Sequence, residues 1–501
     1  MSEKVKITVN ETVVFAEAGA VLSEIVHGEK PCGGHGKCGK CKVMASGELS
    51  AVSEREKQLL TEEELASGVR LSCLTKALGE CVVTTDAPSS QKTQILTEGW
   101  MPAVSADPLF ERYGVAIDIG STTLAARLYD TDGRLLSETS RLNPQAAFGA
   151  DVVSRIEAAL DGKGEDLRQT ILTALDDMIA QLAKKAGVSA ETVDGIVITG
   201  NTVMLHLLTG TSPEPLSHAP FAAERLFGEE CTAEELGLST VLFKTKVYLP
   251  PCIAAFVGAD TICALLATRL CRGEQTKLLV DIGTNGEMAL WHDGKLFACS
   301  TAAGPAFEGV GISMGMRGTD GAIDRVWADG ESILAHVLGD GTAKGICGSG
   351  LIDAIATLLK LELMDETGYL DESLICLTET VSLTQEDVRM VQLAKSAICA
   401  GIGTLLRAAG AEDADVRTTD IAGGFGYYLN MANAAAIGLI PPELERSVRA
   451  VGNAALSGAA MLLLDRSQRK ECEALARQAK VVDLATSPVF SELYMMGMMF
   501  E

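Results

Sequence analysis

The chain has 501 residues, 47% of them hydrophobic, so it is long enough for roughly two to four globular domains with large cores. Its formal net charge of −25 at pH 7 argues against a nucleic-acid partner, because phosphate backbones repel a polyanion. The polar N-terminus lacks the apolar core of a signal peptide, and no apolar run approaches the ~20 residues of a membrane span, so we expect a cytoplasmic protein with no membrane partner.

The first elements of the chain have the order of a β-grasp domain. We expect a hairpin of strands 4–9 and 12–16, a helix over 20–27, a strand over 42–47, a charged helix over 53–68 and a strand pair over 69–85. The hairpin is indicated by two alternating runs that flank the polar pair Asn10–Glu11.

A loop rich in glycine and cysteine, 31-PCGGHGKCGKCK-42, precedes the third of these strands. Most of the fourteen cysteines are scattered and are interpreted as small buried hydrophobic residues. The exceptions have the spacing Cys32-x5-Cys38-x2-Cys41, and Cys73 follows in a later predicted strand. Four thiolates are what a [2Fe–2S] cluster needs, and the glycines let backbone N–H groups approach its sulfides. The first gap is one residue longer than the plant-type C-x4-C-x2-C spacing.

Two other uses of these thiols stay open. A zinc ribbon normally has two CxxC pairs, and the second would have to be Cys73 with Cys81, eight positions apart. A disulfide knot fits poorly with the expected compartment. The cysteine loop and the later stretch VRLSCLT resemble those of [2Fe–2S] ferredoxins, over residues 1–86. The resemblance agrees with the spacing on four cluster ligands: Cys32, Cys38, Cys41 and Cys73.

Residues 87–112 are expected to be a linker. The segment has three prolines and no hydrophobic periodicity. Trp100 and Phe110 predict that part of it docks on a neighbouring domain.

An internal repeat follows the linker. The segment 114-GVAIDIGSTTLAARLYDTDGRLL-136 returns as 278-LLVDIGTNGEMALWHDGKLF-297, which aligns Asp118 with Asp281 and Gly120 with Gly283. Each copy is a buried strand, a glycine turn and a second strand closed by an Asp–Gly turn. A repeat at this range predicts two lobes of like fold.

A strand that ends in D-x-G-[ST] predicts a phosphate-binding loop. The carboxylate holds Mg²⁺ through water, the glycine lets N–H groups face phosphate oxygens, and the hydroxyl adds a donor. Two such loops in register predict a clamp on a nucleoside triphosphate. Four further glycine-rich turns, at 195–210, 303–315, 344–359 and 418–434, fit this interpretation, although each alone is equally well explained as a helix cap or tight turn.

The paired loops, with the late strand–GG turn 422-AGGFG-426, are similar to those of the ATPase fold of actin, sugar kinases and the large heat-shock chaperones. The resemblance implies an α/β fold with lobes over 113–275 and 276–501, each on a five-stranded sheet of the ribonuclease H type, with ATP and Mg²⁺ between them. It implies that Asp118 and Asp281 lie near Mg²⁺ and position the attacking water. The residues implied to contact the nucleotide are Gly120, Ser121, Thr122, Thr123, Asn201, Gly283, Thr284, Asn285, Gly423, Gly424 and Gly426. Glu287 is a weaker candidate, and Asp260 and Asp320 stay open as acidic bases for a hydroxyl acceptor.

A ferredoxin-like domain fused to such an ATPase resembles the reductive activators of corrinoid-dependent enzymes, which return a Co(II) corrinoid to Co(I) with ATP hydrolysis. KGICGSGLIDA and GNTVMLHL are ATPase stretches that carry this resemblance. It implies a corrinoid protein as electron acceptor and an upstream low-potential donor, with a homodimer as one open oligomeric state. Because DIGST begins almost directly after the linker, we expect the chain to lack the middle domain of larger members, which is associated with dimerisation.

Three alternatives stay open. A redox-regulated small-molecule kinase would use the same ATPase fold with the cluster as a sensor. An activator of a radical dehydratase would usually hold a [4Fe–4S] cluster between two subunits, which the cysteine loop disfavours. A non-enzymatic scaffold would keep both sites for structure only.

Overall fold

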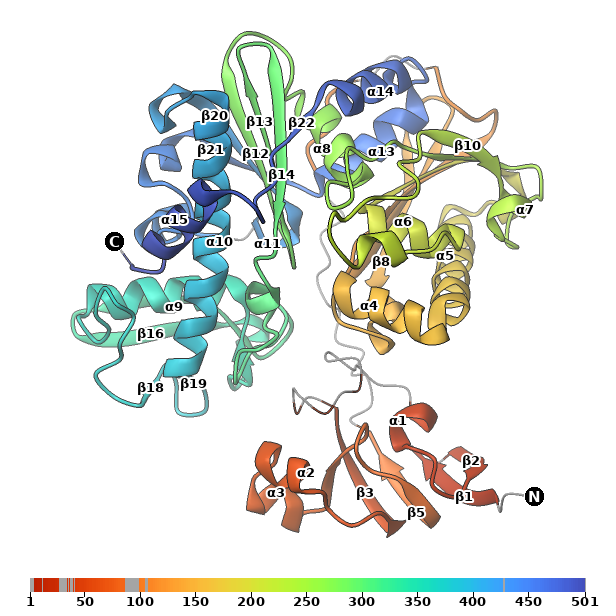
Figure 1. Ribbon diagram of the computed structural model, residues 1–501. Coiled ribbons are helices and arrows are strands. Elements are labelled where there is room, and N and C mark those ends of the chain that lie inside the picture. The colour runs from red at the N-terminus through yellow and green to blue at the C-terminus, as the bar shows by residue number, and fades with distance from the viewer. Residues whose placement is uncertain are drawn as a thin grey trace. The chain divides into compact units, whose positions relative to one another are not determined.

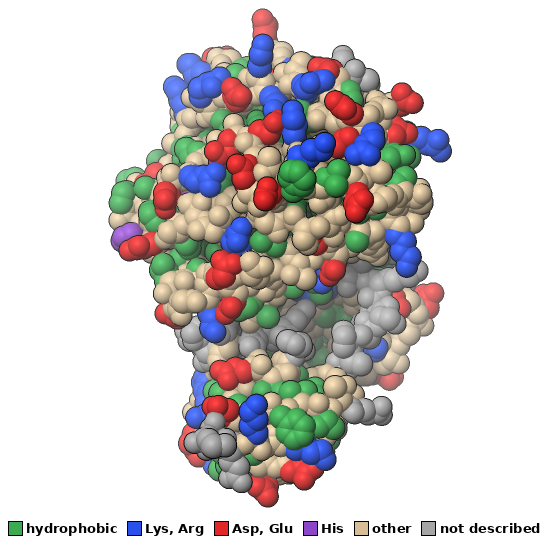
Figure 2. Space-filling view, turned by 90° about the vertical axis from the view of Figure 1, so that its right-hand side faces the viewer, with side chains coloured by type: hydrophobic (Ala, Val, Ile, Leu, Met, Phe, Trp, Pro, Cys, Tyr) green, Lys and Arg blue, Asp and Glu red, His purple; other side chains and the backbone are tan. Residues whose placement is uncertain are grey.

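The computed structural model describes residues 4–10, 12–26, 34, 36, 39, 41–85, 99–103, 107–426 and 429–500, without the side chains of residues 425 and 426. The chain divides into two compact units, residues 1–92 with 144–170 and residues 93–143 with 171–501 (Figure 1). Acidic and basic side chains are interspersed over the face of the second unit in Figure 2, so the net charge of −25 is not gathered into one patch there. No helix among the described residues is long and apolar enough to cross a membrane.

The first unit contains a five-stranded sheet with the order β2-β1-β5-β3-β4. Its elements are β1 (Lys4–Val9), β2 (Thr12–Glu17), α1 (Leu22–Ile25), β3 (Lys42–Leu49), α2 (Glu54–Leu59), α3 (Glu62–Ala66), β4 (Val69–Leu71) and β5 (Ala77–Thr84). The predicted hairpin is confirmed, with Ile7 opposite Val14 in the antiparallel pair of β1 and β2. The first and last strands, β1 and β5, pair in parallel at the centre, which is the arrangement expected of a β-grasp sheet.

The charged stretch over 53–68 forms two helices instead of the one predicted. Ser53 caps α2 through a capping box with Glu56, and Thr61 caps α3 in the same way with Glu64. Leu60 is extended between them, because the second capping box starts a new helix at that point. The fully buried Glu56 accepts a hydrogen bond from Arg70 Nε at 3.0 Å; although burial opposes it, this bond lowers the pKa of Glu56 to about 2. The pair fixes α2 to β4, which leads into Cys73.

The second unit contains two large sheets of matching order. The first is β10-β11-β9-β6-β7-β8. Its strands are β6 (Tyr113–Ile119), β7 (Thr123–Asp130), β8 (Leu135–Leu142), β9 (Val193–Gly200), β10 (Glu229–Thr232) and β11 (Lys246–Leu249). The helices of this part of the chain are α4 (Val152–Ala158), α5 (Gly164–Ala186), α6 (Thr202–Thr209), α7 (Ala233–Leu236) and α8 (Ala259–Thr268). Of these, α4 and the first residues of α5 group with the first unit.

The second large sheet is β21-β20-β12-β13-β14-β22. Its strands are β12 (Thr276–Ile282), β13 (Gly286–His292), β14 (Lys295–Thr301), β20 (Val416–Ala422), β21 (Val448–Gly452) and β22 (Lys480–Val481). Smaller sheets hold β15 (Ala322–Asp329), β16 (Ser332–Val337) and β17 (Gly345–Ile346), and β18 (Leu374–Cys376) with β19 (Ser382–Thr384). The helices are α9 (Gly348–Lys360), α10 (Gln385–Ala409), α11 (Gly423–Gly426), α12 (Met431–Ala436), α13 (Ala454–Leu464), α14 (Gln468–Gln478) and α15 (Pro488–Met496).

The two large sheets confirm the predicted duplication. In each, a three-stranded antiparallel meander is extended by two parallel strands. These are β9 and β11 on the β6 side of the first sheet, and β20 and β21 on the β12 side of the second. Each sheet has one strand more than the five expected. In the first sheet β10 pairs with β11 at the edge, and in the second sheet β22 pairs with β14 at the edge. The core between the sheets includes α8 and α13, which lie so close that a Cβ on Gly458 would be 1.9 Å from the carbonyl oxygen of Cys263.

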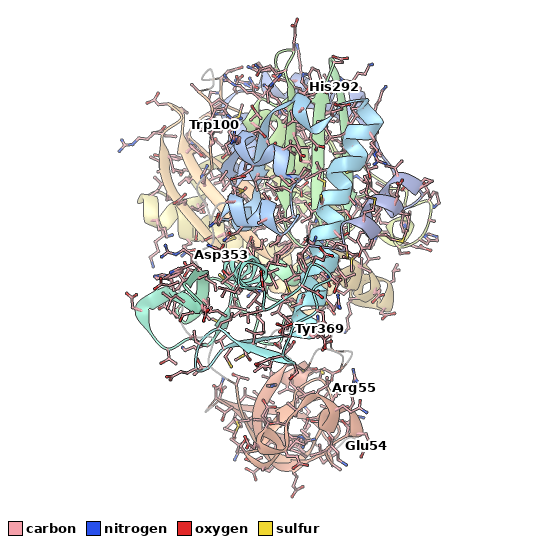
Figure 3. All side chains as sticks on the ribbon, turned by 90° about the vertical axis from the view of Figure 1, so that its left-hand side faces the viewer. Glu54, Arg55, Trp100, His292, Asp353 and Tyr369 are labelled. Atoms are coloured by element: carbon pink, nitrogen blue, oxygen red, sulfur yellow. The ribbon has the colours of Figure 1, made fainter. Side chains whose placement is uncertain are left out.

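The described part of the predicted linker is docked on the second unit. Gly99 forms an antiparallel bridge with Gly452, and Trp100 N–H donates to the Val451 carbonyl at 3.0 Å. The Trp100 ring, labelled in Figure 3, stacks against the Arg449 guanidinium at 5.3 Å. Further along, Phe110 is buried in the core next to β6. The docking expected from Trp100 and Phe110 is therefore observed.

Candidate functional site

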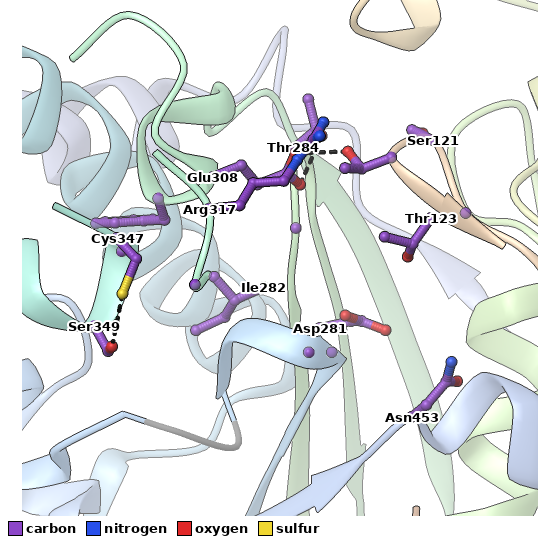
Figure 4. Close-up of a pocket in the computed structure, with 18 of the residues that line it drawn as sticks. Ser121, Thr123, Asp281, Ile282, Thr284, Glu308, Arg317, Cys347, Ser349 and Asn453 are labelled. Atoms are coloured by element: carbon purple, nitrogen blue, oxygen red, sulfur yellow. Dashed lines mark hydrogen bonds between the residues drawn. The ribbon is translucent and has the colours of Figure 1, made fainter. Parts of the chain in front are cut away.

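A cavity of about 530 Å³ opens in the second unit where the repeated strands of both sheets end (Figure 4). This volume is in the range of small-molecule sites. Twelve of the predicted nucleotide-site residues line it: Asp118, Gly120, Ser121, Thr122, Thr123, Asn201, Asp281, Gly283, Thr284, Asn285, Gly423 and Gly424. Gly426 is the last residue of α11, and its surroundings are outside what the structure describes. Of the other acidic candidates, Glu287 and Asp260 line the cavity, and Asp320 is not among its lining residues.

The two loops of the repeat lie at equivalent places in their sheets. Asp118 is the penultimate residue of β6, and Asp281 is the penultimate residue of β12. A backbone hydrogen bond closes each turn, from Gly120 N–H to the Thr123 carbonyl at 2.9 Å and from Gly283 N–H to the Asn285 carbonyl at 3.0 Å. Two carboxylates are thereby presented to one cavity from two sheets.

Glycine is required where β20 meets the second of these loops. Gly423 has φ +89°, and a Cβ there would lie 2.7 Å from Asp281 Oδ1. A side chain at this position would therefore be strained by its backbone and would collide with the carboxylate. The predicted adenosine loop thus makes contact with the predicted metal-binding loop.

Six carboxyl residues and two arginines line the cavity: Asp118, Asp260, Asp281, Glu287, Glu308 and Asp324, with Arg317 and Arg325. Burial raises the pKa of Asp118 and of Asp281 to about 7 and that of Asp260 to about 6. Burial, with Asp260 and Asp281 nearby, also raises the pKa of Glu287 well above its usual range. Buried carboxyl groups with raised pKa values are typical of a cation site or a catalytic centre.

Four helices begin at the cavity, which favours an anionic ligand. The side chains of Asn201 and Asn453 cap α6 and α13, Cys347 precedes the first residue of α9, and Asp260 is in the first turn of α8. Helix N-termini carry partial positive charge and unpaired N–H groups, so they bind phosphate. The helix ends and the carboxylates together suit a polyphosphate held with a divalent cation.

Asn453 and Asn201 tie these helix ends to the loops. Asn453 Nδ2 donates to Asp118 Oδ2 at 3.0 Å, while its Oδ1 accepts from Leu456 N–H at 2.8 Å. Asn201 Nδ2 donates to Ser121 Oγ at 3.2 Å. Asn453 was not predicted from the sequence, although an asparagine directly before the apolar run 454–464 is a recognisable N-cap signal.

Four further charged residues of the cavity were also missed: Glu308, Arg317, Asp324 and Arg325. Glu308 and Arg317 lie beside Thr284 in Figure 4. Glu308 Oε2 accepts from Thr122 Oγ1 at 2.6 Å, and its Oε1 accepts from Thr284 Oγ1 at 3.0 Å. The glycine-rich turn 303–315 was noted in the sequence, but nothing in its pattern marks the glutamate. Glu308 joins the two loops through both of its oxygens.

The raised pKa values give a prediction for divalent cations. A carboxyl whose folded pKa exceeds its unfolded value stabilises the fold fully below pH about 4, and that stability is lost as the pH rises through about 7. Mg²⁺ neutralises the ionised groups, so it should raise the thermal midpoint of the nucleotide-free protein by roughly 2–4 °C at pH 8 and hardly at pH 5. Differential scanning calorimetry at matched ionic strength tests this. Equal shifts at both pH values would contradict it.

The predicted cluster ligands are described in part. The sulfurs of Cys41 and Cys73 are 3.1 Å apart, well beyond a disulfide bond, so the two residues are not joined covalently. Their hydrogen bond lowers the pKa of Cys41 to about 6, so it favours the thiolate that a metal needs. Cys32 and Cys38 lie outside the described residues. Within the described ranges, no group of three or more His, Cys, Asp or Glu is arranged to hold a metal ion directly.

Two family models match the chain. The model described as the C-terminal domain of RACo, the ASKHA domain, matches residues 275–501, and the model described as the RACo middle region matches residues 113–273. The expectation that a middle domain is absent is therefore wrong. The segment that opens with DIGST is itself the family's middle region, so the short distance from linker to DIGST had no bearing on its presence.

Individual proteins agree with these matches. The chain is 38% identical over 422 residues to the corrinoid activation enzyme RamQ of Eubacterium limosum, which covers 77% of this chain and 70% of that protein. It is 26% identical over 415 residues to the [Co(II) methylated amine-specific corrinoid protein] reductase of Methanosarcina barkeri, with 76% of each covered. A solved structure of a reductive activator for a corrinoid, iron–sulfur protein superposes with a TM-score of 0.70 at 27% identity, covering 99% of this chain and 98% of the other.

Proposed function

The chain belongs to the RACo family of reductive activators of corrinoid proteins, and from that premise we propose that it couples ATP hydrolysis to the one-electron reduction of a Co(II) corrinoid protein to Co(I). The observation that carries the ATP part is the cavity at which both copies of the D-x-G loop present a carboxylate. Family membership favours this function over a small-molecule kinase or a dehydratase activator.

The cavity residues have distinct roles in this proposal. The N-termini of α6, α9 and α13, with Ser121, Thr122 and Thr284, bind the phosphate oxygens. Asp118 and Asp281 orient the attacking water, and Asn453 fixes Asp118 by the hydrogen bond at 3.0 Å. Mg²⁺ supplies charge neutralisation when bound, and the donor set of Asp118, Asp281, Asp260 and Glu287 fits it through water ligands, because oxygen ligands suit this ion.

The N-terminal domain is proposed to hold a [2Fe–2S] cluster on Cys32, Cys38, Cys41 and Cys73. The fit rests on the Cys41 and Cys73 thiols, which face each other at 3.1 Å, and on the lowered pKa of Cys41. The cluster supplies one-electron storage and transfer when bound. Cys81 is no counterpart to these residues, because it is buried in β5 and burial raises its pKa.

ATP is needed because the Co(II) corrinoid is harder to reduce than the electron donor. One electron leaves a low-potential donor and passes to Co(II), and ATP with water becomes ADP and phosphate. Movement of the two lobes of the second unit on hydrolysis would make an unfavourable transfer one-way. We further propose a cytoplasmic location and a homodimer, consistent with the presence of the family's middle region.

The test uses the full chain, a low-potential chemical reductant and a Co(II) corrinoid protein, with the Co(I) absorption spectrum as readout. Co(I) should form only with reductant, ATP and an intact Cys38. Equal Co(I) formation by Asp118→Ala would remove ATP hydrolysis from the mechanism.

A further inference from the structure

Glu308 occupies the place of an anion between the two phosphate loops. Its carboxylate accepts one hydrogen bond from Thr122, at 2.6 Å, and one from Thr284, at 3.0 Å. These residues belong to different lobes, because Thr122 lies between β6 and β7 and Thr284 between β12 and β13. Glu308 therefore connects the lobes through the two hydroxyls that the sequence assigns to phosphate binding.

The backbone around Glu308 is firmly held, so the contact is a built feature of the fold. Glu308 ends the short turn Pro305–Glu308, whose Ala306 and Phe307 are buried in the core of the second sheet. Gly309 follows at φ +77°, and a Cβ on it would lie 2.7 Å from Met316 N. The Glu308 side chain lines the cavity, so it has space in which to change its conformation.

A bound triphosphate would compete with Glu308 for the same donors. A hydroxyl has one proton to donate, and both protons go to Glu308 in this structure. Phosphate oxygens are acceptors and carry negative charge, as does the Glu308 carboxylate. The two anions cannot use the Thr122 and Thr284 hydroxyls at once, and they repel each other at short range.

We propose that Glu308 is a positioning residue. It accepts the hydrogen bonds of the Thr122 and Thr284 hydroxyls when no terminal phosphate is present, and the terminal phosphate of ATP accepts them in its place. The proposal rests on the ATP site of the proposed function. ADP leaves Glu308 in place because it lacks the terminal phosphate. Glu308 thus favours the ADP-bound and empty states over the ATP-bound state. The exchange of its two hydrogen bonds makes the contact between the lobes depend on which nucleotide is bound.

The test compares nucleotide affinities in Glu308→Gln, which has the same shape without the charge. Calorimetric titration of the full chain with Mg²⁺ and either a non-hydrolysable ATP analogue or ADP gives the two dissociation constants. Binding of the ATP analogue should tighten about tenfold, while ADP binding changes less than twofold. Glu331→Gln, an exposed glutamate outside the cavity, is the matched control and should change neither.

A double-mutant cycle ties the effect to the two hydroxyls. In a Thr122→Val, Thr284→Val background, the gain from Glu308→Gln should shrink to less than threefold, because there are no donors left to compete for. If Glu308→Gln misfolds, Glu308→Asp replaces it. The shorter side chain cannot reach both hydroxyls, so it should also shift affinity toward the ATP analogue, by a smaller factor.

Three results would overturn the proposal. Equal tightening for both nucleotides would mark a general charge effect. Unchanged affinities with a hundredfold loss of kcat would make Glu308 a catalytic base. A full tenfold gain in affinity for the ATP analogue in the background without the two hydroxyls would show that the effect of Glu308 does not depend on its hydrogen bonds to the loops. These readouts need no corrinoid protein, so they remain informative if the reductase function fails, and absence of nucleotide binding by the wild-type chain would refute the ATP site itself.

Discussion

Asp281→Asn should lower the kcat of ATP hydrolysis by about 10²–10⁴-fold, with a smaller effect on ATP binding. The substitution keeps the size of the side chain but removes the charge that, in the proposed function, orients the attacking water and holds the cation. Asp281 has no side-chain hydrogen-bond partner among those found for the described residues, whereas Asn453 donates to Asp118, so the substitution should act through the loss of charge and not through a lost hydrogen bond. Phosphate release by the full chain, in the presence of its corrinoid partner, measures kcat.

Asp353→Asn is the matched control for this substitution. Asp353 is also buried, and burial raises its pKa, but it lies on α9, bonded to Asn433 at 2.6 Å and outside the lining of the cavity. It should leave kcat within about twofold. Similar losses in both variants would show that buried negative charge in general, and not the loop position, supports hydrolysis.

Cys73→Ser should abolish Co(I) formation while ATP hydrolysis persists. Serine is a harder and more basic ligand than the thiolate, so it binds iron poorly at this position. Visible absorption and electron paramagnetic resonance should show loss of the [2Fe–2S] signals, and the Co(I) spectrum should fall to background. The ATPase cavity belongs to the second unit, so phosphate release should change less than twofold.

Cys81→Ala controls for the loss of a neighbouring thiol. Cys81 is almost fully buried in β5, so its replacement should leave the cluster spectrum in place. Loss of the cluster in Cys81→Ala with retention in Cys73→Ser would exchange the two assignments. A metal content of one zinc and no iron in the wild-type chain would instead restore the zinc ribbon as the better interpretation of these thiols.

The sequence predicted those parts of the site that are carried by local pattern. Asp118 and Asp281 each sit at a strand end before a glycine, so their repetition was visible without any knowledge of the fold. The meander of strands around each loop followed from alternation and from the Asp–Gly turns. These signals are local because a strand and its turn are encoded within about twenty residues.

The parts that could not be predicted depend on contacts between distant segments. Glu308 reaches Thr122 across 186 positions, and Asn453 reaches Asp118 across 335. Neither partner has a local pattern that identifies the other. The extra edge strands β10 and β22 are two to four residues long, too short for a periodicity signal. The single helix predicted over 53–68 was wrong because two capping boxes outweighed a continuous helical pattern.

The docked end of the linker limits where an electron can be delivered. The chain is anchored at Gly99 to the end of β21, the strand that immediately precedes Asn453. Fourteen residue steps separate Thr85, which follows the sheet of the first unit, from this anchor, and at roughly 3.3–3.6 Å per step the chain between them can span at most about 50 Å. The domain with the cysteines is thus tethered at a fixed point next to Asn453, which lines the cavity. The reach of the cysteines from Gly99 is therefore limited to the length of this connection plus the dimensions of the domain itself, and an acceptor whose cobalt is held beyond that reach would not be reduced, even at saturating concentration.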